Sequence, residues 1–512
     1  MYKCGTLARA LATIVLMSMV QAMNSGPAER KQSSQRKLSP ETMAPPGARP
    51  SAPGKSGQPG QDEGDEGYFP FVQSSEVLNP ESVVGVIFKP GKKVELSNEK
   101  TYYVTQLNNE EFNFSDQNSF KKHPKLISAE FNGLSLSRDS LENIIKYIPD
   151  ALKSLLVHSC VIKESYYELL ADLVKRRPDL ITFSIVDTEA SAESLIKLLT
   201  ALQNCKKLQF LRIVIGEISK DVLEIVASIL EECSATLKEF SFGCISHDGD
   251  SETSQKLMEA IGKASKLTKL EFSILSATDA ELESFSSAVG ELQKLRALQL
   301  FIGGIAEHDH IKLFEAAETF QKSLEKQRDL ESLDISSMNL PGDIMQLWMQ
   351  ALQQEIHKLK TLNISGNTLD EKSAEFLSST LSSNRELSIF IANDCGIDDK
   401  VLNATFKNLK NSGLEQIYLS RNHIEKSAAS IPFSELPNLL LIDLSHNKMQ
   451  YEDAFALIQK TPDSQKLSLV NLEGLENGAM DTVALKIWFD DLETWKYQYL
   501  PNRQIVYLGL GG

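Results

Sequence analysis

The stretch LKTLNISGNTL, residues 359–369, decides the fold of this chain of 512 residues. Its apolar and asparagine positions are separated by three, two, three and two residues, at Leu359, Leu362, Ile364, Asn367 and Leu369. This spacing matches neither the period of an amphipathic helix nor the plain alternation of a half-buried strand. It is explained by a short strand, with Leu362 and Ile364 on one face, followed by a bend at Asn367.

The same pattern recurs along most of the chain. Thirteen copies, separated by 25 to 35 residues, begin at residues 126, 152, 180, 208, 237, 267, 295, 330, 359, 387, 414, 439 and 467. A nearly constant period of this length is typical of a solenoid, in which each copy forms one turn and stacks on its neighbours.

The bend position of each copy favours a residue whose side chain can form hydrogen bonds with the backbone. Asparagine or cysteine occupies it in five copies, as Asn367, Asn422, Asn447, Cys160 and Cys395. A buried asparagine amide can bond to backbone groups that the bend leaves without partners. Other residues stand at this position in the remaining copies, and we expect less regular turns at three of them, Thr188, Gly216 and Met338.

The spacing LxxLxLxx(N/C)xL with a period of roughly 20–29 residues is the signature of leucine-rich repeats. The second half of a copy carries a helical stripe, for example Ile344, Leu347, Trp348, Ala351 and Leu352. A strand plus a full helix in about 28 residues resembles the ribonuclease-inhibitor-like subfamily. The resemblance implies an α/β horseshoe with parallel strands on the concave face and helices on the convex face. It specifies the fold and leaves the ligand open.

Composition divides the chain into five predicted segments. They are a signal peptide (1–22), a disordered linker rich in Pro, Gly and Ser (23–67), a small β-rich unit (68–122), the repeats (123–475) and a C-terminal cap (476–512). The linker lacks a hydrophobic pattern, so it cannot bury a core. The β-rich unit is interpreted as a cap of the array, with a separate binding module as the alternative.

The first 22 residues have the features of an export signal. Lys3 and Arg9 precede the apolar run ALATIVLMSMV, and Val20-Gln21-Ala22 offers a small-residue cleavage site. The run of eleven residues is too short to span a bilayer, which needs about 20. We therefore expect an exported protein, secreted, periplasmic or surface-located, with no membrane insertion after cleavage. Delivery to a host cell is one destination that fits.

Net charge and cysteine count restrict the partners and the chemistry. The formal charge of −16 disfavours nucleic acids and anionic membranes and favours a protein partner with a basic surface. Removal of the signal would leave five cysteines without a CxxC motif, an odd number that indicates buried core thiols instead of a disulfide framework or a zinc site.

The sequence contains no motif of a known catalytic class that we could identify. It has no GxxxxGK[ST], GxSxG or HExxH pattern. His308 and His310 flank Asp309, but an HxH alone lacks further ligands at a metal-binding spacing. We predict that the protein is not an enzyme and holds neither a cofactor nor a metal.

The outward-facing third, fifth and seventh residues of each copy should line the concave face. Apolar residues there form an N-terminal group, which includes Phe210 and Val214, and a C-terminal group with Ile389, Ile391, Tyr418, Leu441 and Leu469. Most of the charged outward residues are acidic, among them Asp334 and Asp443. Exposed apolar side chains beside acidic ones are typical of an interface, so we predict partner binding at these nine residues. The alternative is that a cap covers the apolar groups.

These observations predict a non-catalytic scaffold that binds a protein through the concave face of the repeats, in the manner of a bacterial host-interaction factor. Two alternatives stay open. One is a regulator of an enzyme, such as a GTPase activator or a hydrolase inhibitor. The other is a structural surface protein tethered by the linker.

Overall fold

In the computed structural model the chain divides into two compact units, Met1–Leu78 and Asn79–Gly512. All residues that the structure describes belong to the second unit. They are 84–90, 101–106, 126–132, 141–142, 145–146, 148, 150–158, 164–187, 190–247, 249–274, 277–303, 310–410, 412–463, 466–474 and 506–508. The predicted signal peptide and linker lie outside these residues.

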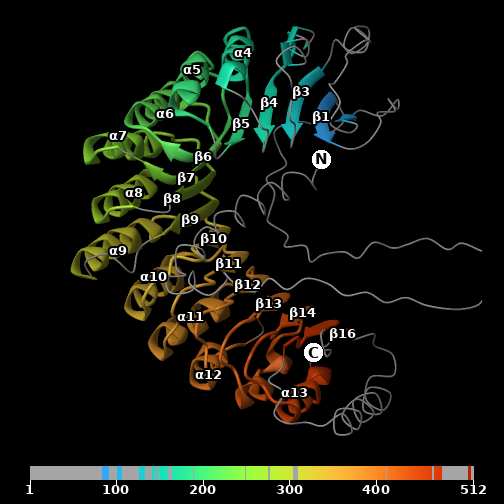
Figure 1. The fold of residues 1–512 in the computed structure, drawn as a ribbon. Helices are drawn as coiled ribbons and strands as arrows, with labels where there is room; N and C mark the ends of the chain where they lie inside the picture. Colours follow the sequence, from blue (N-terminus) through green and yellow to red (C-terminus); the bar gives the residue numbers. More distant parts are fainter. Residues whose placement is uncertain are drawn as a thin grey trace, which may run out of the picture. The chain divides into compact units, whose positions relative to one another are not determined.

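The described strands form one parallel sheet of sixteen strands, in the order β16 through β3 and then β1 and β2. Figure 1 shows these strands on one side of the array. Their bounds are β1 Val84–Pro90, β2 Thr101–Gln106, β3 Leu126–Asn132, β4 Ser154–His158, β5 Thr182–Asp187, β6 Phe210–Ile218, β7 Glu239–His247, β8 Lys269–Ile274, β9 Ala297–Ile302, β10 Ser332–Asp334, β11 Thr361–Asn363, β12 Ile389–Ile391, β13 Gln416–Tyr418, β14 Leu441–Asp443, β15 Leu469–Asn471 and β16 Val506–Leu508.

Helices follow the strands and lie on the other side of the sheet (Figure 1). They are α4 Glu164–Lys175, α5 Ala192–Leu202, α6 Lys220–Cys233, α7 Ser251–Gly262, α8 Asp279–Glu291, α9 His310–Leu324, α10 Gly342–Glu355, α11 Glu371–Ser383, α12 Asp399–Phe406 and α13 Tyr451–Ile458. Most begin at a side chain that accepts a hydrogen bond from a backbone N–H of the first turn, as at Ser191, Ser219, Asp250, Thr278, Asp370 and Asp398. The predicted helix after residue 340 is confirmed as α10.

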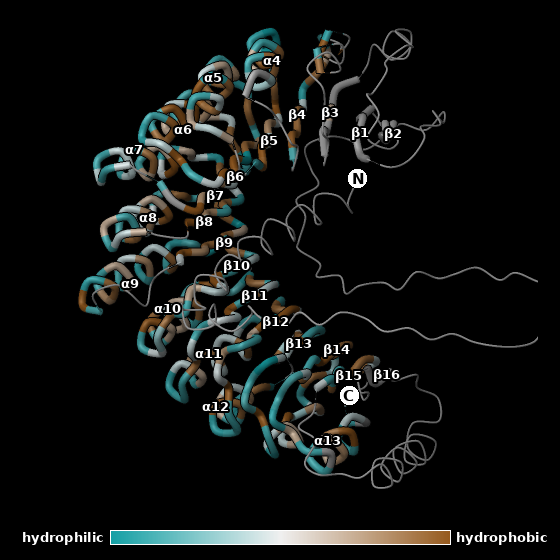
Figure 2. Tube along the Cα trace, viewed as in Figure 1, coloured by the Kyte–Doolittle hydropathy of each residue, from teal (hydrophilic) through white to brown (hydrophobic). Residues whose placement is uncertain are grey.

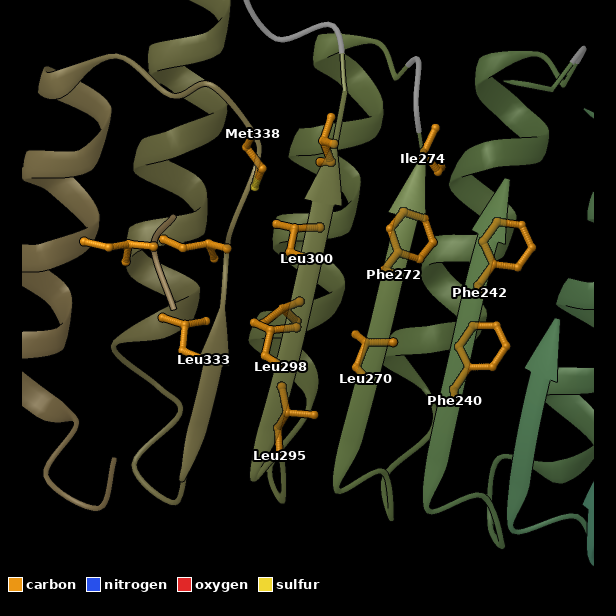
Figure 3. Packing of buried hydrophobic residues seen from close by; sticks show 14 of the residues in the cluster. Phe240, Phe242, Leu270, Phe272, Ile274, Leu295, Leu298, Leu300, Leu333 and Met338 are labelled. Carbon is orange, nitrogen blue, oxygen red and sulfur yellow. The ribbon is translucent and has the colours of Figure 1, made fainter. Parts of the chain in front are cut away.

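The core lies between the sheet and the helices. Strand residues in register stack in rows across neighbouring copies, as Phe240, Leu270, Leu298 and Leu333 do in Figure 3. Figure 2 shows hydrophobic residues along the strands and mixed hydropathy along the helices, because each helix buries one stripe only. Successive copies therefore share one continuous core, and no copy could bury its apolar face alone.

The bend asparagines bond to the backbone as predicted. The Nδ2 group of Asn422 donates to the carbonyls of Ala392 and Leu419 at 2.8 and 3.0 Å. Its Oδ1 atom accepts from the N–H groups of Cys395 and Ile397 at 2.9 and 3.0 Å. Asn367 and Asn447 make equivalent bonds, so these amides join each copy to the preceding one.

Some copies that lack the bend residue have longer strands. Strands β10 to β15 contain three residues each, whereas β6 and β7 contain nine. Gly216 stands at the bend position within β6, and without an amide there the strand continues. The irregular turn predicted at Gly216 is confirmed. The one predicted at Met338 is wrong: β10 has three residues, because the Asn367 amide of the next copy bonds to the backbone of Ile335 and Leu340 around that bend. Thr188 and Cys160 lie outside the described residues.

One copy does not contain the α-helix that we expected in every repeat. The copy that begins at Leu414 has 3₁₀ helices instead, η3 (Lys426–Ser430) and η4 (Phe433–Glu435). This copy has only 25 residues, and Pro432 and Pro437 interrupt its second half. Proline lacks a backbone N–H and clashes with the preceding helical turn, so an α-helix is disfavoured there. A third 3₁₀ helix, η5 (Thr461–Asp463), follows α13.

The predicted outer strands extend the same sheet. Within the predicted β-rich unit, residues 84–90 and 101–106 are found as β1 and β2, and β1 pairs in parallel with both β2 and β3. Within the predicted C-terminal cap, β16 pairs with β15. The rest of both segments lies outside the described residues, and the segment boundaries stay predictions. None of the helices in the described part is long and apolar enough to cross a membrane.

Candidate functional site

The surface that the sequence points to is the face of the sheet opposite the helices, which we call the sheet face. Neighbouring strands pair in register, so equivalent positions of successive copies form rows across it. The row of third positions contains Thr361, Ile389, Gln416, Leu441 and Leu469. The row of fifth positions contains Asn363, Ile391, Tyr418, Asp443 and Asn471. Residues that are about 28 positions apart in the sequence therefore lie side by side, about 4.8 Å apart.

Three residues of the predicted C-terminal group form a cluster of their own. Ile389, Ile391 and Tyr418 pack together separately from the main core, and Leu441 packs against them. We call these four residues the sheet-face cluster. Ile389, Ile391 and Tyr418 are only 8–9 % exposed, which is less than we expected for outward positions. Leu469 is half-buried and lies next to Leu441 in register.

The fifth position has a structural task in the copies around this cluster. Asp334, Asn363, Asp443 and Asn471 stand there, and each side-chain oxygen accepts a hydrogen bond from the N–H group two residues further on. The distances are 2.9–3.1 Å, to Ser336, Ser365, Ser445 and Glu473. This local turn closes the end of each strand and explains why Asp or Asn recurs at the position.

Ile391 and Tyr418 break that rule in two adjacent copies. The N–H group of Asn393 donates instead to Ser365 Oγ at 3.0 Å, and that of Ser420 donates to Asn393 Oδ1 at 2.8 Å. Side chains of the preceding copies thus replace the missing turn oxygens. The N–H groups of Asn393 and Ser420 are therefore satisfied without a side-chain acceptor at Ile391 or Tyr418, so closing these turns does not require Asp or Asn at the fifth position. The sequence carries a signal of this difference, because the residues two apart are I-x-N and Y-x-S in these copies where the neighbouring copies have Asp or Asn first.

The two predicted acidic site residues differ in environment. Asp334 is buried, and its Oδ1 atom also accepts from Ser336 Oγ at 2.6 Å. Burial raises the pKa of Asp334 despite these hydrogen bonds. Asp443 is half-buried and pairs in register with Tyr418. Burial, and then the Asp443 carboxylate, raises the pKa of the Tyr418 hydroxyl, which donates to Gln416 Oε1 at 2.9 Å. Asp443 therefore belongs to the surroundings of the sheet-face cluster, and a partner-binding role of either carboxylate stays a prediction.

The predicted N-terminal group is less compact. Val214 is buried outside the main core and lies in one row with Val186 and Gly243. A Cβ atom at Gly243 would lie 3.4 Å from Val214 Cγ1, so the glycine leaves this valine uncovered on one side. Phe210 is half-buried four residues earlier on β6, in a different row. The structure places both predicted residues on the sheet face without grouping them in one cluster.

A hollow of about 550 Å³ lies on the helix side, between α11, α12 and η3. It forms where η3 replaces a full helix beside α12. Charged residues of both signs line it, with Glu371 and Glu375 opposite Lys400 and Lys407. This mixture indicates no particular class of ligand.

The described residues do not assemble a metal site. None of their His, Cys, Asp and Glu side chains forms a group of three or more that could hold a metal ion. His310 Nε2 lies 3.0 Å from Asp343 Oδ2, and both side chains are exposed. His308 and Asp309 lie outside the described residues.

The thiols in the described part are buried and unpaired. They are Cys205, Cys233, Cys244 and Cys395. Burial raises the pKa of Cys205 to about 11 and the pKa values of the other three to about 12. Because the thiolate is the reactive form, these cysteines are protected from oxidation even in an oxidising compartment.

We expect the four thiols to react with a disulfide reagent such as DTNB at least about 100-fold more slowly in the folded protein than in urea. A variant with C4S and C160S isolates them, because these substitutions remove the other two cysteines. The absorbance of released thionitrobenzoate gives the rate. Rapid reaction of even one thiol under native conditions would contradict the buried placement.

No family model matches the chain, and no curated protein matches it. A solved structure titled "Crystal structure of TLR13-ssRNA13 complex" aligns with a TM-score of 0.41 and 14% sequence identity, over 77% of this chain and 52% of the other. The present chain thus spans about half the length of that one. Thirteen sequence copies, a parallel strand in each described copy and the asparagine bends show that this chain has the fold of a leucine-rich repeat solenoid.

Proposed function

We propose that the protein is a non-catalytic scaffold that binds another protein through the sheet face of its C-terminal repeats. The observation that carries this proposal is the sheet-face cluster, in which Ile391 and Tyr418 replace the turn-forming Asp or Asn of neighbouring copies. Apolar side chains at positions that the fold does not require are best explained by a ligand. We propose export as well, on the basis of the signal-like residues 1–22.

The chemistry of the cluster favours a protein ligand. A tyrosine held in one orientation by Gln416, with isoleucines beside it, provides a rigid amphipathic contact surface. Residues of this kind at the centre of an interface contribute most of its binding energy, while polar residues around them exclude water. Asp443 and Glu473 and the net charge of −16 favour a basic surface on the partner.

Replacement of Tyr418 by aspartate is expected to weaken partner binding by about 2 kcal/mol or more, which is about thirtyfold in affinity. The substitution places a second carboxylate next to Asp443 and removes the aromatic contact. The measurement is affinity capture with the immobilised protein, followed by quantitative mass spectrometry and titration of each captured protein.

Ile311→Asp is the matched control, because Ile311 is 70 % exposed on α9 and the change adds the same charge on the helix side. Circular dichroism must show that both variants are folded. Equal recovery of the partners by Y418D and I311D would exclude the sheet-face cluster as the interface. Binding that does not weaken at high salt would argue against a basic partner surface.

A further inference from the structure

The residue before the bend has a left-handed backbone in the C-terminal copies. This eighth position has φ angles of +52° to +71° in six successive copies, at Ser337, Gly366, Asp394, Arg421, His446 and Gly474. The N–H groups of Asp394, Arg421 and His446 donate to carbonyls of the following copy, at Ser420, Ser445 and Glu473. These bonds hold the backbone in place, so the conformation is imposed by the fold and is independent of the side chain.

Glycine is the residue that suits such a position best, because side chains with a Cβ atom are strained there. Two copies follow this preference. At Gly366 an added Cβ atom would lie 3.0 Å from Ser337 Cα, and at Gly474 it would collide with the His446 ring. Asp and His tolerate the left-handed region better than most residues, whereas a long side chain such as arginine is uncommon. Arg421 is therefore the residue of this row that local conformation explains least.

In the described part of the chain, the Arg421 side chain makes no polar contact that would compensate for the strain. Its side chain is exposed, and the guanidinium has no ion pair or hydrogen bond with any residue in the described part of the chain. Arg421 lies three residues after Tyr418, beyond the end of β13. Strained residues without a structural benefit are concentrated at functional sites.

We propose that Arg421 recognises a carboxylate of the protein segment that binds the sheet-face cluster. This inference rests on the proposed function and adds one specific contact to it. A guanidinium binds a carboxylate through two parallel hydrogen bonds, which gives both affinity and a defined orientation. Because Arg421 follows Tyr418 by three residues in the chain, this charged contact would lie at the edge of the apolar cluster, where polar residues of an interface are found.

The charges around Arg421 favour one carboxylate over a polyanion. Asp394 occupies the same row in the preceding copy, and Asp443 lies next to Tyr418 in the following one. These carboxylates would repel a phosphate backbone or a run of acidic residues. A segment with a single Asp or Glu among basic and aromatic residues would pair its carboxylate with Arg421 and its basic residues with the surrounding carboxylates.

Selection from a phage library of random peptides of about twelve residues tests the proposal on the full chain. Wild-type protein is expected to enrich peptides that combine one Asp or Glu with basic or aromatic residues. Arg421→Gly should remove the preference for the acidic residue and weaken the best peptide about tenfold, measured by fluorescence anisotropy. Its melting temperature should equal or exceed that of the wild type, because glycine suits the backbone conformation.

Ser337→Gly makes the same backbone change at φ +61°, two copies before the sheet-face cluster, and should leave the selected motif and the affinity unchanged. Arg421→Lys keeps the positive charge but lacks the planar guanidinium with its two parallel N–H donors, and it should bind with intermediate affinity.

If R421G selects the same acidic motif and binds it with the same affinity as the wild type, the role of Arg421 alone is overturned. A lower melting temperature of R421G would also overturn it, since Arg421 would then stabilise the fold. If the wild type enriches only peptides that Y418D also enriches, the proposed function and this inference are both overturned.

Discussion

Replacement of Asn422 by alanine is expected to lower the free energy of unfolding by about 3–5 kcal/mol. The side chain is 3 % exposed and bonds to two N–H groups and two carbonyls of the copies it joins. Alanine would leave the N–H groups of Cys395 and Ile397 buried without an acceptor. Each unsatisfied buried group costs about 1–3 kcal/mol, so the losses accumulate.

Urea unfolding followed by circular dichroism gives this difference. Asn403→Ala is the control, because Asn403 is exposed on α12 and alanine favours a helix. Asn422→Cys should cost less than Asn422→Ala, since Cys395 occupies the bend of the preceding copy and donates its thiol to the Ile364 carbonyl at 3.3 Å. Equal stability of N422A and N403A would show that the bend amides are dispensable.

Replacement of Phe272 by alanine is expected to cost a similar amount, about 3–5 kcal/mol, for a different reason. Phe272 lies on β8 with 2 % of its surface exposed (Figure 3). Its ring centroid is 5.6 Å from that of Phe242 on β7 and 4.7 Å from that of Phe285 on α8. Alanine would leave a cavity where strand and helix meet, and the neighbouring rings would lose their contacts.

The neighbouring strand supplies a control of the same residue type. Phe301 lies on β9, is half-buried, and pairs in register with Ser273, one position away from Phe272. It therefore points to the opposite face of the sheet, and Phe301→Ala should cost about 1 kcal/mol or less. Thermal unfolding monitored by circular dichroism ranks the two variants. A loss for F301A as large as for F272A would mean that the core does not lie on the helix side alone.

Much of the fold could be predicted from the spacing of one short stretch. Leu362 and Ile364 are both buried, and Asn367 bonds to the backbone at the bend, as LKTLNISGNTL predicted. Repetition of the spacing predicted the parallel stack, because identical turns can bury their apolar edges only against one another. The α-helix expected after β13 was the exception, since prolines and a short copy favoured 3₁₀ turns there.

The candidate site could be predicted only in part. The sequence placed Ile391, Tyr418 and Asp443 on the face opposite the helices, since strand side chains alternate in direction. It did not predict that Ile389, Ile391 and Tyr418 pack into a cluster that is only 8–9 % exposed, or that Asp334 is buried in a turn of its own. Both results depend on which side chains of neighbouring copies meet.

The sequence by itself therefore determined the direction of each side chain, the period of the coil and the residue at each bend, because these depend on local geometry within one copy. The tertiary structure alone decided that the N–H groups of Asn393 and Ser420 bond to side chains of the preceding copies. It also decided the left-handed backbone at Arg421. The physical reason is that these features arise from hydrogen bonds between copies about 25–28 residues apart in the chain. Such bonds require the register of stacked strands, which no single copy contains.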